Sequence, residues 1–232
     1  MQPIDTSSQV VEVVPHPLPY FSLALDGPEE WREILPGQFV MVETTDGLEP
    51  YLRRAFSVHD VSKTDRGARI ELLVKIVGPG TRALAGKRPG ERLAVLGPLG
   101  QPFSCAASAP AAAGSNGPAG SAGAAGADAA AGCAGSDTRP VALVAGGVGS
   151  APLLLLARWL LAAGTCFDFY YGGRSRVDLA RSAVFESLAQ ASGGNLISTT
   201  EDGSAGERGL ITAPLARRLA AGAYRKIFTC GP

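Results

Sequence analysis

The stretch VALVAGGVGSAPLLLLARWLL, residues 141–161, decides how the C-terminal part of this chain folds. It begins with a short apolar run rich in valine, continues through a glycine-rich turn, and ends in a long apolar segment typical of a buried helix. Ser150 is a candidate N-cap of that helix, and Pro152 falls in the first turn, where proline is tolerated. The stretch therefore predicts a buried strand, a tight turn and a helix.

The same alternation of strand and helix patterns continues to the end of the chain. The patterns predict, in order, a strand at Cys166–Tyr171, a helix around Ala180–Ala191, a strand at Asn195–Thr199, a helix near Ala213–Ala220 and a strand at Arg225–Thr229. Strands that alternate with helices form a parallel sheet with helices on both faces, and such sheets bind nucleotides at the carboxyl ends of their strands. We therefore expect residues 139–232 to form an α/β domain.

The glycine-rich turn departs from the usual dinucleotide fingerprint. Gly146, Gly147, Gly149 and Ala151 give G-G-x-G-x-A in place of G-x-G-x-x-G. The second predicted strand leads into two glycines and Arg174, without the acidic residue that would hold a ribose. Two interpretations of the turn stay open: a loop that admits a dinucleotide, or a turn that allows a strand and a helix to pack closely.

The N-terminal region, residues 1–103, has a different pattern. Apolar and β-branched runs, separated by Gly, Pro and Asp, predict strands at Val10–Val14, Tyr20–Leu25, Gln38–Glu43, Ala55–His59, Arg69–Val77 and Arg92–Leu96. Charged and apolar residues alternate along Arg69–Leu72, as they do in a strand with one buried face. These six strands predict a small antiparallel β-barrel.

Two motifs of this region contain residues that a β-sheet scaffold alone does not require. LRRAFSVHD places Arg54 and Phe56 on one face of a strand and Ser57 on the other. VGPGTRALAGKRPGE starts a helical turn after Gly78 and Gly80, and backbone amides in such a turn can bind an anion. Taken alone, Arg54 also suits an ordinary surface cation, and the second motif also suits an ordinary turn.

Composition limits the remaining possibilities. Residues 104–138 are almost entirely Ala, Gly, Ser and Pro, which predicts a flexible insertion between the two domains. The chain balances 21 basic against 21 acidic residues, so nothing favours a nucleic acid partner. The longest apolar runs fall short of the roughly 20 residues that span a bilayer, and no signal-peptide pattern is present, so we expect a soluble, cytoplasmic protein without membrane contact.

The four cysteines are scattered and carry no C-x-x-C spacing. They lie at positions 105, 133, 166 and 230. This arrangement supports neither a disulfide framework nor a metal site.

The motifs gain specificity from their order along the chain. In sequence they are R-x-F-S (54–57), V-G-P-G-T (77–81), G-P-L-G (97–100), G-G-V-G-S-A-P (146–152), T-E-D-G-S-x-G (200–206) and C-G-P (230–232). This series resembles the ferredoxin-NADP reductase superfamily, and within it the electron-transfer subunits of dihydroorotate dehydrogenase. The resemblance covers nearly the whole chain except the insertion, and it implies a flavin-binding barrel followed by a nicotinamide-dinucleotide-binding α/β domain.

The resemblance implies FAD-binding residues in the first domain. Arg54 would pair with an FAD phosphate, because a guanidinium stays charged and matches phosphate oxygens. Phe56 and Ser57 would lie along the flavin ring. The full implied set on this domain is Arg54, Ala55, Phe56, Ser57, Leu73, Val74, Lys75, Gly78, Gly80 and Thr81, of which the last three would hold the pyrophosphate.

The resemblance also implies a nicotinamide site in the second domain. Gly146, Gly147 and Gly149 would let NAD(P)H approach the sheet edge, with Asp202 bordering the same cleft. Cys230 would lie where nicotinamide meets flavin, so Ser57 and Cys230 are the candidate catalytic residues. Arg174 and Arg176 leave the choice between NADH and NADPH open, because they can reach a 2′-phosphate or face solvent.

The implied function is FAD-dependent electron transfer from NAD(P)H to a catalytic dehydrogenase subunit in pyrimidine biosynthesis. The family's [2Fe-2S] cluster needs four thiolates held together. Such ligands are missing here, so we expect a C-terminally truncated member. The alternatives are a hydrogenase-type or bifurcating NAD(P)H reductase subunit, a stand-alone flavin reductase, or a non-catalytic flavin-binding subunit.

Overall fold

The computed structural model describes residues 2–44, 52–104 and 137–231, which form two compact units. The first unit contains the described residues up to Pro102, and the second begins at Phe103. The predicted insertion at 104–138 lies almost entirely outside the described residues. Within the described residues, no helix is both long enough and apolar enough to cross a membrane.

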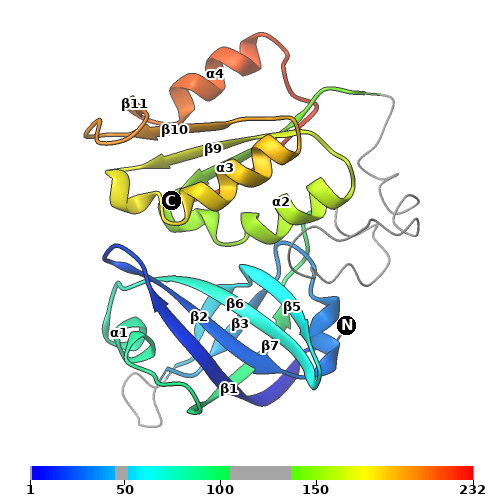
Figure 1. The fold of residues 1–232 in the computed structure, drawn as a ribbon, viewed down its shortest axis with the longest axis vertical. Helices are drawn as coiled ribbons and strands as arrows, with labels where there is room; N and C mark the ends of the chain where they lie inside the picture. Colours follow the sequence, from blue (N-terminus) through cyan, green and yellow to red (C-terminus); the bar gives the residue numbers. More distant parts are fainter. Residues whose placement is uncertain (1, 45–51, 105–136, 232) are drawn as a thin grey trace. The chain divides into compact units, whose positions relative to one another are not determined.

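The first unit is built on a seven-stranded antiparallel sheet (Figure 1). Its strands are β1 (Ile4–Pro15), β2 (Tyr20–Gly27), β3 (Phe39–Val42), β4 (Arg54–Ser57), β5 (Asp60–Thr64), β6 (Gly67–Lys75) and β7 (Arg92–Leu99). They lie in the order β4-β3-β7-β1-β2-β6-β5. A 3₁₀ helix, η1 (Glu29–Glu33), follows β2, and helix α1 (Pro79–Ala85) follows β6.

The sheet curls so that its two outer strands approach each other. Strands β4 and β5 stand at opposite ends of the sheet order, yet only Val58 and His59 separate them in the chain. The Val58 amide donates to the carbonyl of Gln38 at 3.0 Å, and the His59 amide donates to that of Glu71 at 2.8 Å. The two residues thereby join the β3 side of the sheet to β6. The predicted antiparallel β fold of this domain is confirmed, and the sheet takes the form of a curled half-barrel.

The sequence-based count of six strands is too low because it misses β5. This strand reads DVSKT and carries one buried apolar residue, Val61. Its formation depends on pairing with β6, in a register that places Asp60 opposite Glu71 and Thr64 opposite Gly67. A polar strand of this kind has little hydrophobic pattern of its own, so tertiary pairing decides it.

Trp31 fills one end of the half-barrel. It is fully buried on η1, and a Cβ built on Gly27 would lie 2.3 Å from its ring. The next residue, Arg32, donates to the carbonyls of Gly67 at 2.9 Å and Thr64 at 2.7 Å. These bonds attach η1 to the turn between β5 and β6, so the short helix stabilises the strand pair at the edge of the sheet.

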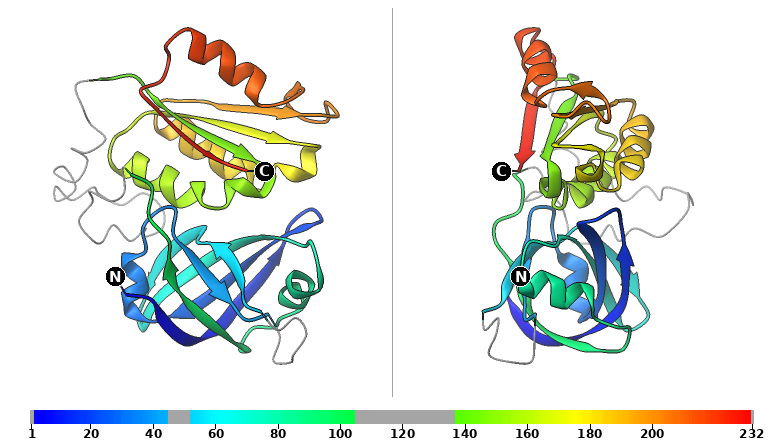
Figure 2. Two further views of the ribbon diagram at one scale, coloured as in Figure 1. Left: turned by 180° about the vertical axis from the view of Figure 1, so that it is seen from behind. Right: turned by 90° about the vertical axis from the view of Figure 1, so that its left-hand side faces the viewer.

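The second unit is a five-stranded parallel sheet with helices on both faces, as the alternating pattern predicts. Its strands are β8 (Val141–Gly146), β9 (Phe167–Gly173), β10 (Leu196–Thr200), β11 (Glu207–Arg208) and β12 (Lys226–Cys230), in the order β11-β10-β9-β8-β12. The helices are η3 (Gly147–Ser150), α2 (Leu153–Ala162), η4 (Arg176–Asp178), α3 (Ser182–Ala191) and α4 (Thr212–Ala220). Figures 1 and 2 show α2 and α3 on one face of this sheet and α4 on the other.

One local prediction in this unit is wrong. Ser150 does not cap α2: the helix begins after Pro152, and no side chain caps it. Ser150 instead ends the 3₁₀ turn η3 and is fully buried. Its hydroxyl lies within hydrogen-bond distance of the Tyr171 hydroxyl on the neighbouring strand β9.

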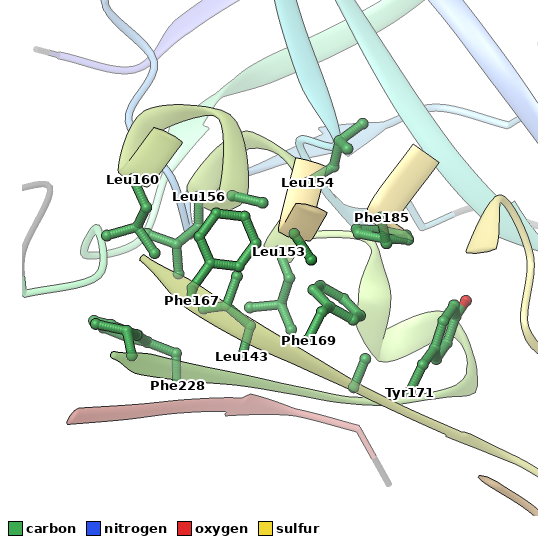
Figure 3. Close-up of a cluster of buried hydrophobic side chains, with 14 of the residues drawn as sticks. Leu143, Leu153, Leu154, Leu156, Leu160, Phe167, Phe169, Tyr171, Phe185 and Phe228 are labelled. Carbon is green, nitrogen blue, oxygen red and sulfur yellow. The ribbon is translucent and has the colours of Figure 1, made fainter. Parts of the chain in front are cut away.

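Aromatic and leucine side chains fill the space between the sheet and helices α2 and α3 (Figure 3). Phe185 of α3 is fully buried and stacks on Phe169 of β9, with ring centroids 4.2 Å apart. It also meets the edge of Tyr171 at 5.7 Å. Phe185 is therefore the aromatic anchor of α3 on the sheet.

The opposite face of the sheet, under α4, buries a polar network. Asp168 accepts hydrogen bonds from Tyr224 Oη at 2.5 Å and from the Asn195 amide at 2.9 Å. Tyr170 Oη lies 2.7 Å from Tyr224 Oη. Burial raises the pKa of Tyr224, so its hydroxyl keeps the proton that it donates to Asp168. The network connects β9, β10 and the start of β12.

Replacing Phe185 with alanine is expected to destabilise the second unit strongly. Loss of a fully buried aromatic ring costs about 3–5 kcal/mol in unfolding free energy, because a cavity remains beside Phe169. Urea unfolding followed by tyrosine fluorescence measures the change. The control is Leu219→Ala, at a position 40% exposed on α4, with an expected change below about 0.5 kcal/mol. Equal losses in the two variants would contradict the packing described for α3.

Candidate functional site

The strand order of the second unit reverses direction between β8 and β12. From β8 the chain adds β9 and β10 on one side of the sheet, and it later returns to place β12 on the other side of β8. In open α/β sheets, ligands bind outside the carboxyl ends of the strands where this reversal of direction occurs. The glycine loop follows β8, and Cys230 and Gly231 end β12, so the predicted nicotinamide residues lie at this point.

The glycine loop and the end of β12 approach each other too closely for side chains. A Cβ built on Gly149 would lie 2.2 Å from the carbonyl oxygen of Cys230. Gly231 has a φ of 157°, and a Cβ there would lie 2.9 Å from the amide nitrogen of Gly146. For Gly149, the geometry therefore supports the close-packing interpretation of the loop. Binding of a dinucleotide by Gly146, Gly147 and Gly149 stays a prediction.

A buried hydrogen-bond chain, which the sequence patterns did not indicate, holds the glycine loop. Tyr171 Oη lies 2.8 Å from Ser150 Oγ and donates to the carbonyl of Ala180 at 3.0 Å. Burial raises the pKa of Tyr171, so the phenol stays protonated and able to donate. Only the polar character of Ser150 and Tyr171 in otherwise apolar runs signals this pair in the sequence.

Asp202 lies in the turn after β10, at the same edge of the sheet as the glycine loop. Its carboxylate accepts hydrogen bonds from the Ser204 amide at 2.9 Å and the Ser204 hydroxyl at 2.6 Å, and these bonds lower its pKa. The Asp202 amide donates to the carbonyl of Arg174 at 3.1 Å. Asp202 thus shapes the turn, while Arg174 is exposed and Arg176 donates to the carbonyl of Ser204.

Cys230 is a half-buried free thiol at the end of β12. Burial raises its pKa above the ordinary thiol value, partly offset by a backbone hydrogen bond from Gly231. The nucleophilic form of cysteine is the thiolate, which a raised pKa disfavours near neutral pH. The environment therefore suits a small packing side chain rather than a nucleophile.

The predicted flavin residues on β4 occupy a short strand paired with β3. Arg54 lies opposite Val42, and Ser57 lies opposite Phe39. Arg54, Phe56 and Ser57 are half-buried, and Ala55 is exposed. The Arg54 guanidinium donates to the carbonyl of Leu52 at 2.8 Å, and no carboxylate of the described residues forms an ion pair with it.

The predicted flavin residues on β6 lie at the end of a mostly buried strand. Leu73 and Val74 are buried, and Lys75 is half-buried with its ammonium 5.2 Å from the centroid of the Tyr20 ring. Strand β4 contacts β6 across the curl of the sheet. The fold therefore brings together two segments that are separate in the sequence.

The V-G-P-G-T motif differs from its prediction in one respect. The Gly78 amide is not uncovered, because Thr81 Oγ1 accepts hydrogen bonds from it at 3.1 Å and from the Val77 amide at 2.9 Å. The amides of Gly80 and Thr81 lie in the first turn of α1, where a helix offers no internal acceptor. A Cβ built on Gly78 would meet nothing within 4 Å, so open space adjoins this turn.

The described residues do not match the metal cluster that the resemblance implies. They contain no group of three or more His, Cys, Asp or Glu placed to hold a metal ion. Of the cysteines, only Cys166 and Cys230 are described: Cys166 precedes β9, at the amino ends of the strands, and Cys230 ends β12, at their carboxyl ends.

Comparison with known proteins finds two oxidoreductase domain models in the chain. Residues 8–103 match the model of the oxidoreductase FAD-binding domain, and residues 143–232 match that of the oxidoreductase NAD-binding domain. The chain is 31% identical, over 91% of its length and 68% of the relative's, to the dihydroorotate dehydrogenase B (NAD(+)) electron transfer subunit of Lysinibacillus sphaericus. The chain belongs to the family of these electron transfer subunits, within the ferredoxin reductase superfamily. It is an NAD(P)H-dependent flavoprotein oxidoreductase.

Further relatives of this family show the same extent of match. The subunit of the same name from Desulforamulus reducens is 29% identical over 91% of this chain and 68% of its own length. For the Bacillus velezensis subunit the match covers 63% of that protein, so this chain spans about two thirds of the curated relatives. A solved NADH-dependent reduced ferredoxin-NADP oxidoreductase shares the fold, with a TM-score of 0.71 over 98% of this chain and 68% of that chain, at 24% identity.

Replacing Gly149 with alanine is expected to separate the glycine loop from β12. The added methyl group would clash with backbone atoms of Cys230, which cannot rotate away as a side chain can. We expect a loss of about 2–4 kcal/mol in unfolding free energy of the NAD-binding domain. Gly78→Ala is the matched control, because its methyl group would enter open space from an extended backbone. Thermal unfolding by circular dichroism would contradict this packing if both variants melted like the wild type.

Alkylation of Cys230 is expected to be slow at pH 7–8 and to increase steeply above pH 9. The raised pKa leaves less thiolate at a given pH than an ordinary cysteine has, and thiolate is the form that reacts. Iodoacetamide labelling across this pH range, quantified by mass spectrometry of the C-terminal peptide, measures the profile. Rapid labelling at pH 7 would show a lowered pKa and reopen a nucleophilic role.

Proposed function

We propose that this protein transfers electrons from NAD(P)H through FAD to a catalytic dehydrogenase subunit, and that the acceptor reaction is the oxidation of dihydroorotate in pyrimidine biosynthesis. The observation that carries the proposal is the match, over 91% of the chain, to subunits named for this role. The presence of both an FAD-binding and an NAD-binding domain supplies the chemistry that such a role needs.

The first unit offers the features that FAD requires. Arg54 carries a charge that no carboxylate of the described residues neutralises, which suits a phosphate partner. The first turn of α1 adds the amides of Gly80 and Thr81 beside the open space at Gly78. Phe56, Ser57 and the end of β6 supply half-buried surface for a ring system. We assign Arg54 and this turn to the diphosphate, and Phe56 and Ser57 to the ring.

The second unit offers a matching place for NAD(P)H. The glycine loop and Cys230 lie at the point between β8 and β12 where the strand order reverses, and we assign NAD(P)H to this point. The chemistry that a bound FAD would supply is uptake of a hydride from NAD(P)H and release of its two electrons to the acceptor. The chain's own residues position the two nucleotides, and Cys230 keeps its proton.

Replacing Arg54 with alanine is expected to weaken FAD binding at least tenfold, because one charge-assisted contact to phosphate is worth roughly 1.5–3 kcal/mol. The matched control is Arg53→Ala. Arg53 is the preceding residue, but its guanidinium pairs with Asp5 at 3.0 Å. FAD affinity is measured by titration of the apoprotein with fluorescence detection. Equal affinities in Arg54→Ala and wild type would remove Arg54 from the FAD site.

The electron-transfer role is tested by anaerobic stopped-flow. Mixing the FAD-loaded protein with NADH or NADPH is expected to bleach the flavin absorbance, and the faster nucleotide defines the donor. Adding the catalytic dihydroorotate dehydrogenase subunit of the same organism should then allow dihydroorotate to reduce NAD(+). Bleaching without this coupled reaction would favour a stand-alone flavin reductase, and absence of bleaching would favour a non-catalytic flavin-binding subunit.

A further inference from the structure

One buried hydrogen-bond chain joins three segments at the dinucleotide edge of the second unit. Tyr171 donates its only hydroxyl proton to the carbonyl of Ala180, at 3.0 Å. The 2.8 Å contact with Ser150 must then run in the other direction, with Ser150 Oγ as donor and Tyr171 Oη as acceptor. The chain of bonds therefore leads from the glycine loop, through the end of β9, to the residue before Arg181.

The two ends of this hydrogen-bond chain lie in loop segments: the glycine loop, which also packs on Cys230 at Gly149, and the turn before α3. Ser150 closes the 3₁₀ turn that contains the glycine loop, where glycines give the backbone wide freedom. Ala180 precedes Arg181, the one residue other than glycine with a positive φ, 60°, among the described residues. Tyr171 is fully buried against Phe185, so its ring is a fixed point between them (Figure 3).

Both segments border the crevice assigned to the dinucleotide. The glycine loop follows β8, and residues 174–181 follow β9, the strand next to β8 in the sheet. A ligand at the carboxyl ends of these strands meets both loops. Ser150 and Tyr171 are themselves completely buried, so neither can touch the ligand.

We propose that Tyr171 is a positioning residue for the dinucleotide, which sets the spacing of the glycine loop and the 174–181 segment through Ser150 and Ala180. The inference rests on the proposed function, because it assumes that NAD(P)H binds at this edge. Losing the hydroxyl would leave Ser150 Oγ buried without its acceptor and Ala180 without its donor. The glycine loop would then sample other positions, and nucleotide binding would have to select the competent one.

The experiment compares Tyr171→Phe with Tyr170→Phe in the FAD-loaded protein. Tyr170 is the neighbouring residue on the other face of β9, equally buried, and its hydroxyl also bonds a second hydroxyl, that of Tyr224 at 2.7 Å. Each variant removes one buried phenolic hydroxyl from the same strand, so their losses of stability should be similar. Only Tyr171→Phe should affect the glycine loop.

Two measurements separate the positioning role from a purely structural one. In Tyr171→Phe we expect KM for the nicotinamide donor to rise about tenfold, with kcat changed less than about twofold, the pattern of weakened binding. We also expect amide hydrogen exchange of residues 147–151 to accelerate in the nucleotide-free protein. Tyr170→Phe should show neither change. Ser150→Ala provides a second variant, in which KM and the exchange rate should change in the same direction. The double variant Ser150→Ala/Tyr171→Phe should have nearly the same KM and exchange rate as Tyr171→Phe alone.

The outcomes are distinct. If Tyr171→Phe lowers thermal stability as Tyr170→Phe does, with unchanged KM and exchange, the hydroxyl is structural and the inference is wrong. If the wild-type protein neither binds nor oxidises NAD(P)H, the proposed function fails. In that case the exchange measurement still decides whether Tyr171 holds the glycine loop, and unchanged exchange would overturn that link as well.

Discussion

The close approach of the glycine loop to the end of β12 is the constraint on which the second unit depends. Gly149 lies so near the Cys230 carbonyl that a single methyl group would not fit. A methyl group on Gly231 would likewise be too close to the backbone of Gly146. Because β12 pairs with β8 on the side away from β9, this contact lies at the reversal in strand order at which α/β sheets bind ligands.

The two units bring the proposed nucleotide-binding residues together by different means. In the first unit the antiparallel sheet curls, which brings β4, with Arg54 and Phe56, against β6. In the second unit the parallel sheet aligns its carboxyl ends, and buried hydroxyl groups fix the loops that follow. Each proposed site combines backbone amides with few charged groups, as expected for cofactors that carry the reactive chemistry themselves.

Much of the candidate site could be predicted from the sequence because its motifs are local. R-A-F-S forms a strand, V-G-P-G-T forms a turn into a helix, and G-G-V-G forms a turn after a buried strand. The functions of individual residues were less predictable, because they depend on neighbours distant in the chain. The Gly78 amide donates a hydrogen bond to the Thr81 hydroxyl. Gly149, which has no side chain, lets the backbone of Cys230, 81 positions further along the chain, approach closely.

The sequence by itself determined the class of each domain, since hydrophobic periodicity and glycine positions are local properties that a reader can count. It also determined the order of the motifs, which is what indicates the family. Tertiary structure alone decided that the polar run Asp60–Thr64 becomes a strand, because only pairing with β6 satisfies its backbone. It also decided that Ser150 bonds Tyr171 rather than capping α2, because both hydroxyl groups are buried, where an unpaired hydroxyl is costly.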